Sequence, residues 1–505
     1  MKKLATLLLA AGLVFGAATG ASAIDFKASG EWMMSFELGS NGNFNAAQGG
    51  FNGPDGTEDN FEAEQRIRLK LDAVASENLS GTVMFEIGES KWGQSKDNVG
   101  RSSGNALGTD GVSIEVKRAY IDWIAPNTDL SLRMGLQGVA LPSFVNGNQV
   151  LDDDVAAIVA NYKFNDNVAL TALWARPFND NYEGYKTGNG TQDAAMFDNV
   201  DVFSAIVPLT FDGINVTPWV AYGMIGKNAG YVNPDGGYAV GSYEKGSYAN
   251  RQADAYGSMF AAGLTGEITM ADPFRFAWDL EYSGYKSGFG GKKHYEGGSK
   301  FSNDQAGWVF AALGEYKMDW GTPGLYAWYA SGNDDNAYNG SEQIYQLNNG
   351  GSEFAALAFD GNNGTNGIGR GYLLGDNVAG TWGIGARLKD MSFLEGLKHT
   401  FRVTYMMGTN SNDSIAYGGS KSWKNHTDPA ETHNVVYNLG TTEGALEVSL
   451  SNTYQIYENL TMYAEVAYLK LFLDDELRWD SMGANGQKFE QGDAFNMNVA
   501  FQYSF

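Results

Sequence analysis

The sequence lacks several features that define common protein classes. It has no cysteine among its 505 residues, which excludes a disulfide framework and a thiolate metal site. Basic residues are in the minority, since 34 Lys and Arg stand against 59 Asp and Glu and give a formal net charge of −25. A chain this acidic repels phosphate, so the composition argues against nucleic acid as a partner.

Long apolar runs are also missing. After Ala23 no run of 18 apolar residues occurs, whereas a membrane-spanning helix needs about 20. The mean hydropathy of −0.30 is typical of a water-soluble protein. Aromatic residues are nevertheless 13% of the chain and glycines number 66, a combination typical of β-structure. A transmembrane β-barrel places its apolar residues at alternate positions, so its apolar surface is visible only in the periodicity.

The first 23 residues have the composition of a secretory signal peptide. Lys2 and Lys3 precede an apolar run from Leu4 to about Phe15, and the small residues before Ile24 form a cleavage site. The apolar run is too short to span a membrane. We expect cleavage after residue 23, which leaves residues 24–505 as the folded domain.

Strict alternation of apolar with small or polar residues recurs along the rest of the chain. The stretch AFNMNVAFQYSF places Phe501, Tyr503 and Phe505 on one face and Asn498, Gln502 and their neighbours on the other. A period of two describes a strand with one apolar face and one polar face. We count eighteen such segments, centred near residues 32, 67, 84, 118, 133, 160, 172, 205, 220, 262, 279, 312, 328, 385, 404, 450, 466 and 499.

The connections between these segments alternate in length. Every second one is short, for example APNTD, FNDN and YEN, and the others are long and rich in Gly, Asn, Asp and Ser, such as residues 39–60, 227–254 and 331–378. This pattern predicts an all-β transmembrane barrel of antiparallel up-and-down strands, with short periplasmic turns and long extracellular loops. We expect about 18 strands, with 16 as the second choice. A soluble propeller or sandwich is the alternative fold, but neither requires long connections on one side only.

Short motifs resemble a known family. The signal segment, the terminal Phe505, the stretch VKRAYIDW and the following LRMGLQG resemble the Gram-negative trimeric porins, and IDFKASGEWMMSFELG is similar to the outer-membrane homotrimeric porins of sulfate-reducing bacteria. The resemblance implies a homotrimer in the bacterial outer membrane, in contact with its lipid, that forms a water-filled channel for passive diffusion of small hydrophilic solutes and ions, without a cofactor. It also implies that the outer-membrane assembly machinery reads the last strand, with Phe501, Tyr503 and Phe505 as the assembly signal.

In such porins the third long loop folds into the barrel, and here that position is held by GVALPSFVNGNQVLDDD, residues 138–154. We expect this loop to narrow the pore and to place an acidic group, Asp152, Asp153 and Asp154, in the channel. Facing it we expect a row of pore-lining basic residues, Arg66, Arg68, Lys70, Arg118 and Arg133. Facing rows of opposite charge filter hydrated solutes. The alternative is that LDDD is a solvated loop end.

The alternation changes phase near Lys117. Ile114 and Val116 lie on one face, but Ala119 and Ile121 continue the apolar face one residue out of step. A slip of one residue exchanges the two faces, so we expect a β-bulge that turns Arg118, Tyr120 and Asp122 inward. The alternative is that the strand begins at Lys117.

Other functions find less support in the sequence. A substrate-specific channel for a sugar or an organic acid and a surface adhesin or structural outer-membrane protein are the alternatives to a general porin, and the charged inward faces favour a water-filled channel. An enzyme is not expected, because the four His have no nucleophile motif such as G-x-S-x-G nearby. The stretch HTDPAETH, with His426 and His433, is interpreted as a solvated loop, so no metal site is predicted.

Overall fold

The structure of the protein is a computed structural model. It describes residues 24–40, 60–94, 105–107, 114–179, 186–187, 190–191, 199–226, 256–286, 294–296, 299–301, 304–335, 340–347, 352–359, 374, 377–414, 439–474 and 492–505. The predicted signal peptide and the HTDPAETH loop lie outside the described residues. No helix among the residues that the structure describes is long and apolar enough to span a membrane.

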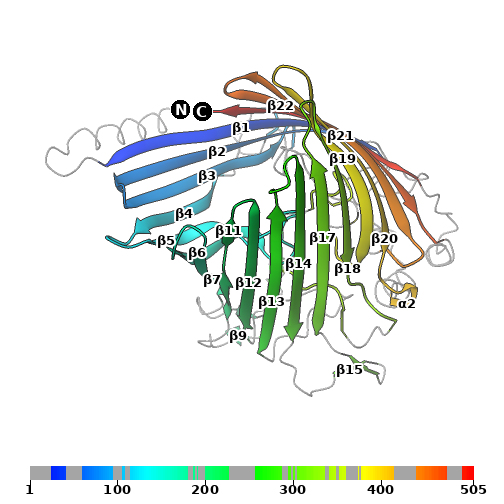
Figure 1. The fold of residues 1–505 in the computed structure, drawn as a ribbon, viewed down its shortest axis with the longest axis horizontal. Coiled ribbons are helices and arrows are strands. Elements are labelled where there is room, and N and C mark those ends of the chain that lie inside the picture. Colours follow the sequence, from blue (N-terminus) through cyan, green and yellow to red (C-terminus); the bar gives the residue numbers. More distant parts are fainter. Residues whose placement is uncertain are drawn as a thin grey trace.

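The chain forms one closed antiparallel β-barrel (Figure 1). Its wall has eighteen strands when β10 and β11, which both pair with β12, are counted as one. In chain order they are β1 (Asp25–Ser40), β2 (Asn60–Ser76), β3 (Leu79–Lys91), β4 (Ile114–Ile124), β5 (Leu130–Ala140), β6 (Asp152–Lys163), β7 (Ala169–Asn179), β10 (Asn199–Ile206) with β11 (Leu209–Phe211), β12 (Ile214–Ile225), β13 (Gly257–Ile268), β14 (Phe274–Lys286), β17 (Gln305–Tyr316), β18 (Thr322–Ala330), β19 (Thr381–Leu394), β20 (Leu397–Gly408), β21 (Gly444–Tyr457), β22 (Leu460–Phe472) and β23 (Ala494–Ser504).

Small elements lie in the long connections. Two short hairpins pair β8 (Lys186–Thr187) with β9 (Gly190–Thr191) and β15 (His294–Glu296) with β16 (Ser299–Phe301). The helix α2 (Asn412–Ser414) follows β20. None of these elements pairs with the wall strands among the described residues.

The barrel closes where the first strand meets the last, seen in Figure 1 as the blue β1 beside the red β23. The two strands pair from Glu31 with Ser504 to Ser40 with Phe495. The pairing extends to the final residue, since the amide of Phe505 donates to the carbonyl of Gly30 at 3.0 Å and the amide of Gly30 donates to the carbonyl of Phe505 at 2.8 Å. Closure leaves no unpaired sheet edge, as a barrel in hydrocarbon requires.

Side chains alternate between the two faces of the wall as the sequence predicted. In β14 the outward residues Phe276, Leu280 and Tyr282 are exposed, whereas the intervening Asp279 and Glu281 are at most 2% exposed. All eighteen predicted segment centres fall inside wall strands, so the prediction of 18 strands is confirmed and the second choice of 16 is wrong.

The connections also follow the prediction. Short turns, such as residues 77–78, 125–129 and 395–396, join the strands at one end of the barrel, and the long connections lie at the other. One wall strand is interrupted at Pro208, which has no N–H to donate to the ladder, and this interruption separates β10 from β11.

The predicted bulge in β4 is confirmed. Met84 of β3 pairs with Arg118 and Phe85 with Val116, so Lys117 is the extra residue on β4. The alternative, a strand that begins at Lys117, is wrong, because β4 starts at Ile114. As a result, Lys117 and Arg118 both reach the same carboxylate, that of Asp154.

Candidate functional site

The connection between β5 and β6, residues 141–151, folds against the inner wall. Its apolar side chains are buried, with Val145 at 6% exposure and Val150 at 0%. Its hydrogen bonds reach β14, which is separated from β6 along the wall by β7, β10, β12 and β13. The segment, which we call the first inward loop, therefore crosses part of the barrel interior.

One carboxylate holds the tip of the first inward loop. Asp279 of β14 accepts hydrogen bonds from the backbone amides of Phe144 (2.8 Å), Val145 (2.9 Å) and Asn146 (3.2 Å). The hydroxyl groups of Ser143 (2.6 Å) and Thr265 (2.5 Å) donate to the same carboxylate. Two residues along β14, Glu281 accepts the amide of Gln149 at 2.8 Å. These hydrogen bonds tie the backbone of the loop to β14 at two points.

A second segment is held in the same way. Residues 352–359, between β18 and β19, form the second inward loop, and Glu447 of β21 accepts the backbone amides of Ala356 (2.5 Å), Leu357 (3.1 Å) and Ala358 (2.8 Å). The ring of Phe354 stacks between the wall residues Tyr326 and Trp328, each with its ring centroid 4.8 Å away.

The two inward loops also contact each other. The hydroxyl of Ser352 donates to the side-chain oxygen of Asn146 at 2.5 Å. The preceding segment, residues 341–347, joins this contact through the amide of Leu347, which donates to the carbonyl of Val150 at 2.9 Å. Tyr345 of that segment stacks on Tyr285 with ring centroids 5.2 Å apart, and its burial raises the pKa of the Tyr345 hydroxyl. Together the segments form a bridge from β14 to β21 inside the barrel.

An open cavity of about 640 Å³ remains between the first inward loop and the wall. We call it the eyelet. It is lined by residues 140–148 with gaps, by Asp152, and by charged side chains of β14, β17, β19 and the second inward loop, namely Arg275, Glu315, Arg387, Lys389 and Glu353. Three basic and three acidic side chains therefore face one space, so their formal charges balance.

The charged groups of the eyelet differ in how firmly they are held. Glu315 bridges two guanidinium groups, at 2.9 Å from Arg275 and 2.7 Å from Arg387. Arg275 also donates to the carbonyl of Phe144 at 3.1 Å, which ties the loop to the basic wall. Lys389 and Glu353 are exposed, so they offer their charge to the open space.

The acidic residues predicted for the constriction are placed differently from the expectation. Asp152, Asp153 and Asp154 are the first residues of β6, paired with Ala140, Val139 and Gly138, and are not part of the loop. The prediction that they lie in the loop is wrong, because the ladder between β5 and β6 extends to the pair of Ala140 with Asp152. Asp152 lines the eyelet, whereas Asp154 is bound to Arg118 at 2.7 Å and Lys117 at 3.0 Å.

The basic residues predicted to line the pore each lie beside a carboxylate of the same or another wall strand. The pairs are Arg66 with Glu89 (2.9 Å), Arg68 with Glu86 (2.7 Å), Lys70 with Asp72 (3.0 Å), Arg118 with Asp154 (2.7 Å) and Arg133 with Asp122 (2.7 Å). Two of the pairs, Arg68 with Glu86 and Arg133 with Asp122, are register neighbours in adjacent strands, which is the geometry that favours opposite-charge pairs. Of these five residues only Arg118 contacts a predicted acidic residue, so the structure does not bring the two predicted rows together.

Some of these pairs join into a row along the wall. Arg68 lies between Glu31 (3.4 Å) and Glu86 (2.7 Å), and Lys117 lies between Glu86 (3.7 Å) and Asp154 (3.0 Å). The row extends from β1 to β6 with charges of alternating sign. Its net effect on a passing ion is smaller than that of an unpaired row of arginines.

Sequence reasoning did not single out the residues that anchor the loops. Asp279, Glu281 and Glu447 sit at inward positions of strands that were predicted correctly, but an inward carboxylate in a barrel is also what a solvated wall requires. An anchoring carboxylate differs from a solvated one only in its contact with the backbone of a loop. That contact cannot be seen in the local sequence pattern. Among the described residues, no group of three or more potential ligands is arranged to hold a metal ion.

Comparisons with known proteins yield distant structural similarities. No family model and no curated protein matches the chain. Among solved structures, it is similar to OpdQ of Pseudomonas aeruginosa (11% identity, TM-score 0.47, covering 95% of this chain and 98% of that one) and to OpdK of the same organism with vanillate (11%, 0.48, 95% and 98%). It is also similar to OccAB3 of Acinetobacter baumannii, with 11% identity, a TM-score of 0.47 and coverage of 95% of this chain and 100% of that one.

Proposed function

We propose that the protein is a porin of the bacterial outer membrane, a water-filled channel for passive diffusion of small hydrophilic solutes and ions. The observation that carries the proposal is the eyelet, an open and charge-balanced cavity of about 640 Å³ inside a closed barrel. The outer face of the wall exposes large apolar side chains, such as Trp308, Phe310 and Leu325, and so suits contact with lipid. In this orientation the short turns are periplasmic and the long loops extracellular.

The eyelet acts as the constriction in this proposal. The first inward loop narrows the barrel from the side of β5 and β6, and the second narrows it from β18 and β21. Solutes then pass between Asp152 on one side and Arg387 with Lys389 on the other. Charges that face each other across a narrow space orient polar solutes and select by sign.

A substrate-specific channel is the second candidate. It is favoured by the number of fixed charged groups that converge on the eyelet, because Glu315 holds Arg275 and Arg387 in defined positions. These held guanidinium groups place a fixed basic surface beside the exposed ammonium group of Lys389, which meets an acidic solute at a constant place. An adhesin would not require an open, charged cavity.

The assembly and oligomer predictions remain proposals. Phe501, Tyr503 and Phe505 lie on the last strand, where Tyr503 and Phe505 are exposed and stack with ring centroids 5.9 Å apart. We propose that assembly machinery reads this end of β23. A homotrimer, like the porins of sulfate-reducing bacteria, is the proposed state in the membrane.

The proposed function predicts stepwise ion conductance. Protein purified in mild detergent and added to a planar lipid bilayer should produce discrete conductance steps in KCl. Steps in equal groups of three would support the homotrimer, and single steps would contradict it. If correctly folded protein produces no ion current across the bilayer, the proposal of a channel is wrong.

The eyelet predicts ion selectivity from single side chains. Asp152→Asn should shift the reversal potential in a salt gradient toward anions, and Lys389→Gln should shift it toward cations. Each change should alter the permeability ratio by about twofold at 0.1 M salt and by less at 1 M, where screening is stronger. The control is Asp166→Asn in the exposed turn between β6 and β7, which should leave the ratio unchanged. If Asp152→Asn and Lys389→Gln change the permeability ratio no more than Asp166→Asn does, the selective region lies elsewhere.

The anchoring carboxylates predict how firmly the first inward loop is held. Because the chain has no cysteine, a single Val145→Cys reports access to the loop tip by its rate of maleimide labelling. Adding Asp279→Asn removes an ionised acceptor of three amides and should speed labelling by about tenfold or more. Asp201→Asn, on β10 and away from the loop, is the matched control. Identical labelling rates in both double variants would show that the carboxylate does not hold the loop.

The closing contact predicts a role for the last residue. Deletion of Phe505 removes the two backbone bonds to Gly30 and should lower the amount of protein recovered from the outer membrane severalfold. Phe393→Ala, an exposed aromatic residue at the same end of the barrel, is the control and should assemble normally. If refolded protein without Phe505 is as heat-resistant as the parent, the loss in cells reports recognition during assembly. Unchanged recovery from the membrane would contradict both roles.

A further inference from the structure

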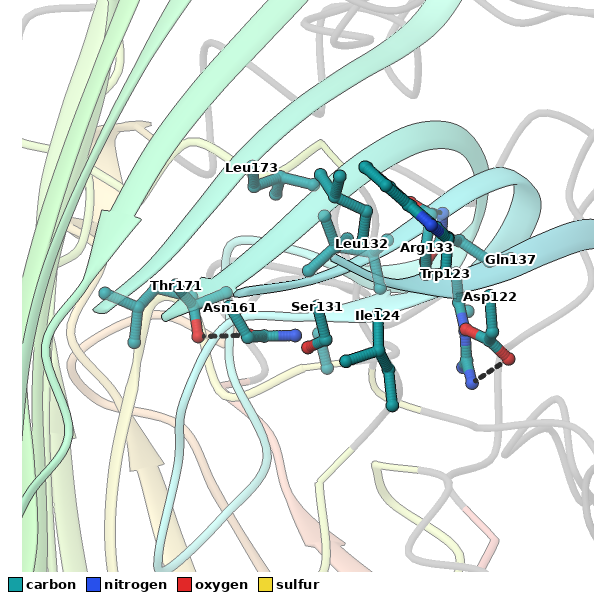
Figure 2. A pocket seen from close by; sticks show the side chains of 15 residues that line it. Asp122, Trp123, Ile124, Ser131, Leu132, Arg133, Gln137, Asn161, Thr171 and Leu173 are labelled. Carbon is teal, nitrogen blue, oxygen red and sulfur yellow. Dashed lines mark hydrogen bonds and ion pairs between the residues drawn. The ribbon is translucent and has the colours of Figure 1, made fainter. Parts of the chain in front are cut away.

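A second cavity opens on the inner wall nearer the turn end of the barrel. It has a volume of about 470 Å³, within the range of small-molecule sites, and shares only Ala140 with the eyelet. Its lining comes from β4, β5, β6, β7 and β10, and Figure 2 shows the side chains that these strands contribute. We call it the lower cavity.

One side of the lower cavity carries a paired charge. The Nε and Nη2 atoms of Arg133 donate to the two oxygens of Asp122 at 2.7 and 3.1 Å, and the guanidinium lies 4.2 Å from the ring centroid of Tyr120. Both side chains are about two-fifths exposed, at 43% and 37%. The Nη1 group of Arg133 has no hydrogen-bond partner in the part of the chain that the structure describes. The pair is therefore neutral as a unit but still has a free donor.

An amide adds a second free donor. The hydroxyl of Thr171 donates to the side-chain oxygen of Asn161 at 2.6 Å, which fixes the orientation of the amide (Figure 2). With its oxygen engaged, the amide nitrogen of Asn161 is left to donate, and no described residue accepts from it. The free groups of Arg133 and Asn161 are thus both N–H donors.

The lining also has an apolar part, beside two further polar side chains, Ser131 and Gln137. Ile124, Val139, Val159, Leu173 and Ile206 contribute side chains from five strands. Val139, Leu173 and Ile206 are at most 8% exposed and belong to one buried apolar cluster, against which Val159 packs, so these side chains form a continuous apolar surface on the inner wall. The lower cavity is therefore amphipathic, because the Arg133–Asp122 pair and the Asn161–Thr171 pair lie at its two ends beside an apolar surface (Figure 2).

We propose that the lower cavity is a subsite for small amphipathic zwitterions, of the class of apolar amino acids. It rests on the proposed channel function. The carboxylate of such a solute accepts from Arg133 and Asn161, its ammonium group lies beside Asp122, and its side chain contacts Leu173 and Val159. A solute with a net charge gains less, because Arg133 and Asp122 cancel each other.

The test uses L-norleucine, glycine and hexanoate as probes of single-channel current in planar bilayers. Norleucine added on the turn side should interrupt the KCl current at concentrations about tenfold lower than glycine, because it adds four apolar carbons. Hexanoate, which lacks the ammonium group, should block less well than norleucine. Equal block by all three probes would overturn the proposal.

Variants identify the site of block. Leu173→Ala should reduce the preference for norleucine over glycine severalfold, and Asn161→Ala should weaken block by both to a similar extent. The double variant Arg133→Gln with Asp122→Asn keeps the shape but removes the charges, and it should abolish the preference for norleucine over hexanoate. Met84→Ala, on β3 and outside the lower cavity, is the control. If norleucine blocks the KCl current equally well in all three variants, the proposed subsite is wrong.

The open-channel current separates the two proposals. If the channel conducts KCl and no probe blocks it, the subsite is wrong and the porin stands. If folded protein gives no current, the porin itself is wrong.

Discussion

Pairing of the backbone between neighbouring wall strands is the constraint on which this structure depends. Each strand has a partner on both sides, and the pairing of β1 with β23 completes the circle. Once the backbone is satisfied in this way, side chains are free to alternate between an apolar outer face and a mixed inner face. The contact between Gly30 and Phe505 matters for the same reason, since it extends the last ladder to the final residue.

Loops that fold into the barrel contain backbone amides that need hydrogen-bond acceptors. Carboxylates of the wall supply them: Asp279 accepts three consecutive amides of the first inward loop, and Glu447 accepts three of the second. An amide buried without a partner costs about 1–3 kcal/mol, so the position of these acceptors determines where each loop can rest. The eyelet is the space that remains beside the first inward loop, and it is lined by charges from β14 to β19. The lower cavity lies along the inner wall itself, where β4 to β10 contribute an apolar surface.

The wall was predictable because its pattern is local. In a strand such as β14 the alternation of apolar and polar residues repeats every two positions. The length of the connection that follows can be read directly from the sequence. Even the bulge at Lys117 was visible as a change of phase. The end of a strand is less well marked: β6 begins at Asp152 because its backbone pairs with Ala140, although three consecutive aspartates resemble a loop. Composition alone does not reveal whether a partner strand is present.

The sequence by itself determined the barrel, its strand number, its closure and the side on which the long loops lie, because each follows from alternation and spacing along the chain. Only the tertiary structure decided which charges meet. Register brings together Arg68 with Glu86, Arg133 with Asp122 and Arg275 with Glu315, and Arg387 reaches the same Glu315 from a third strand. The backbone amides that donate to Asp279 are more than 130 positions away along the chain, in the loop that it holds. Contacts of that kind depend on the curvature and closure of the whole wall, which no segment of sequence specifies alone.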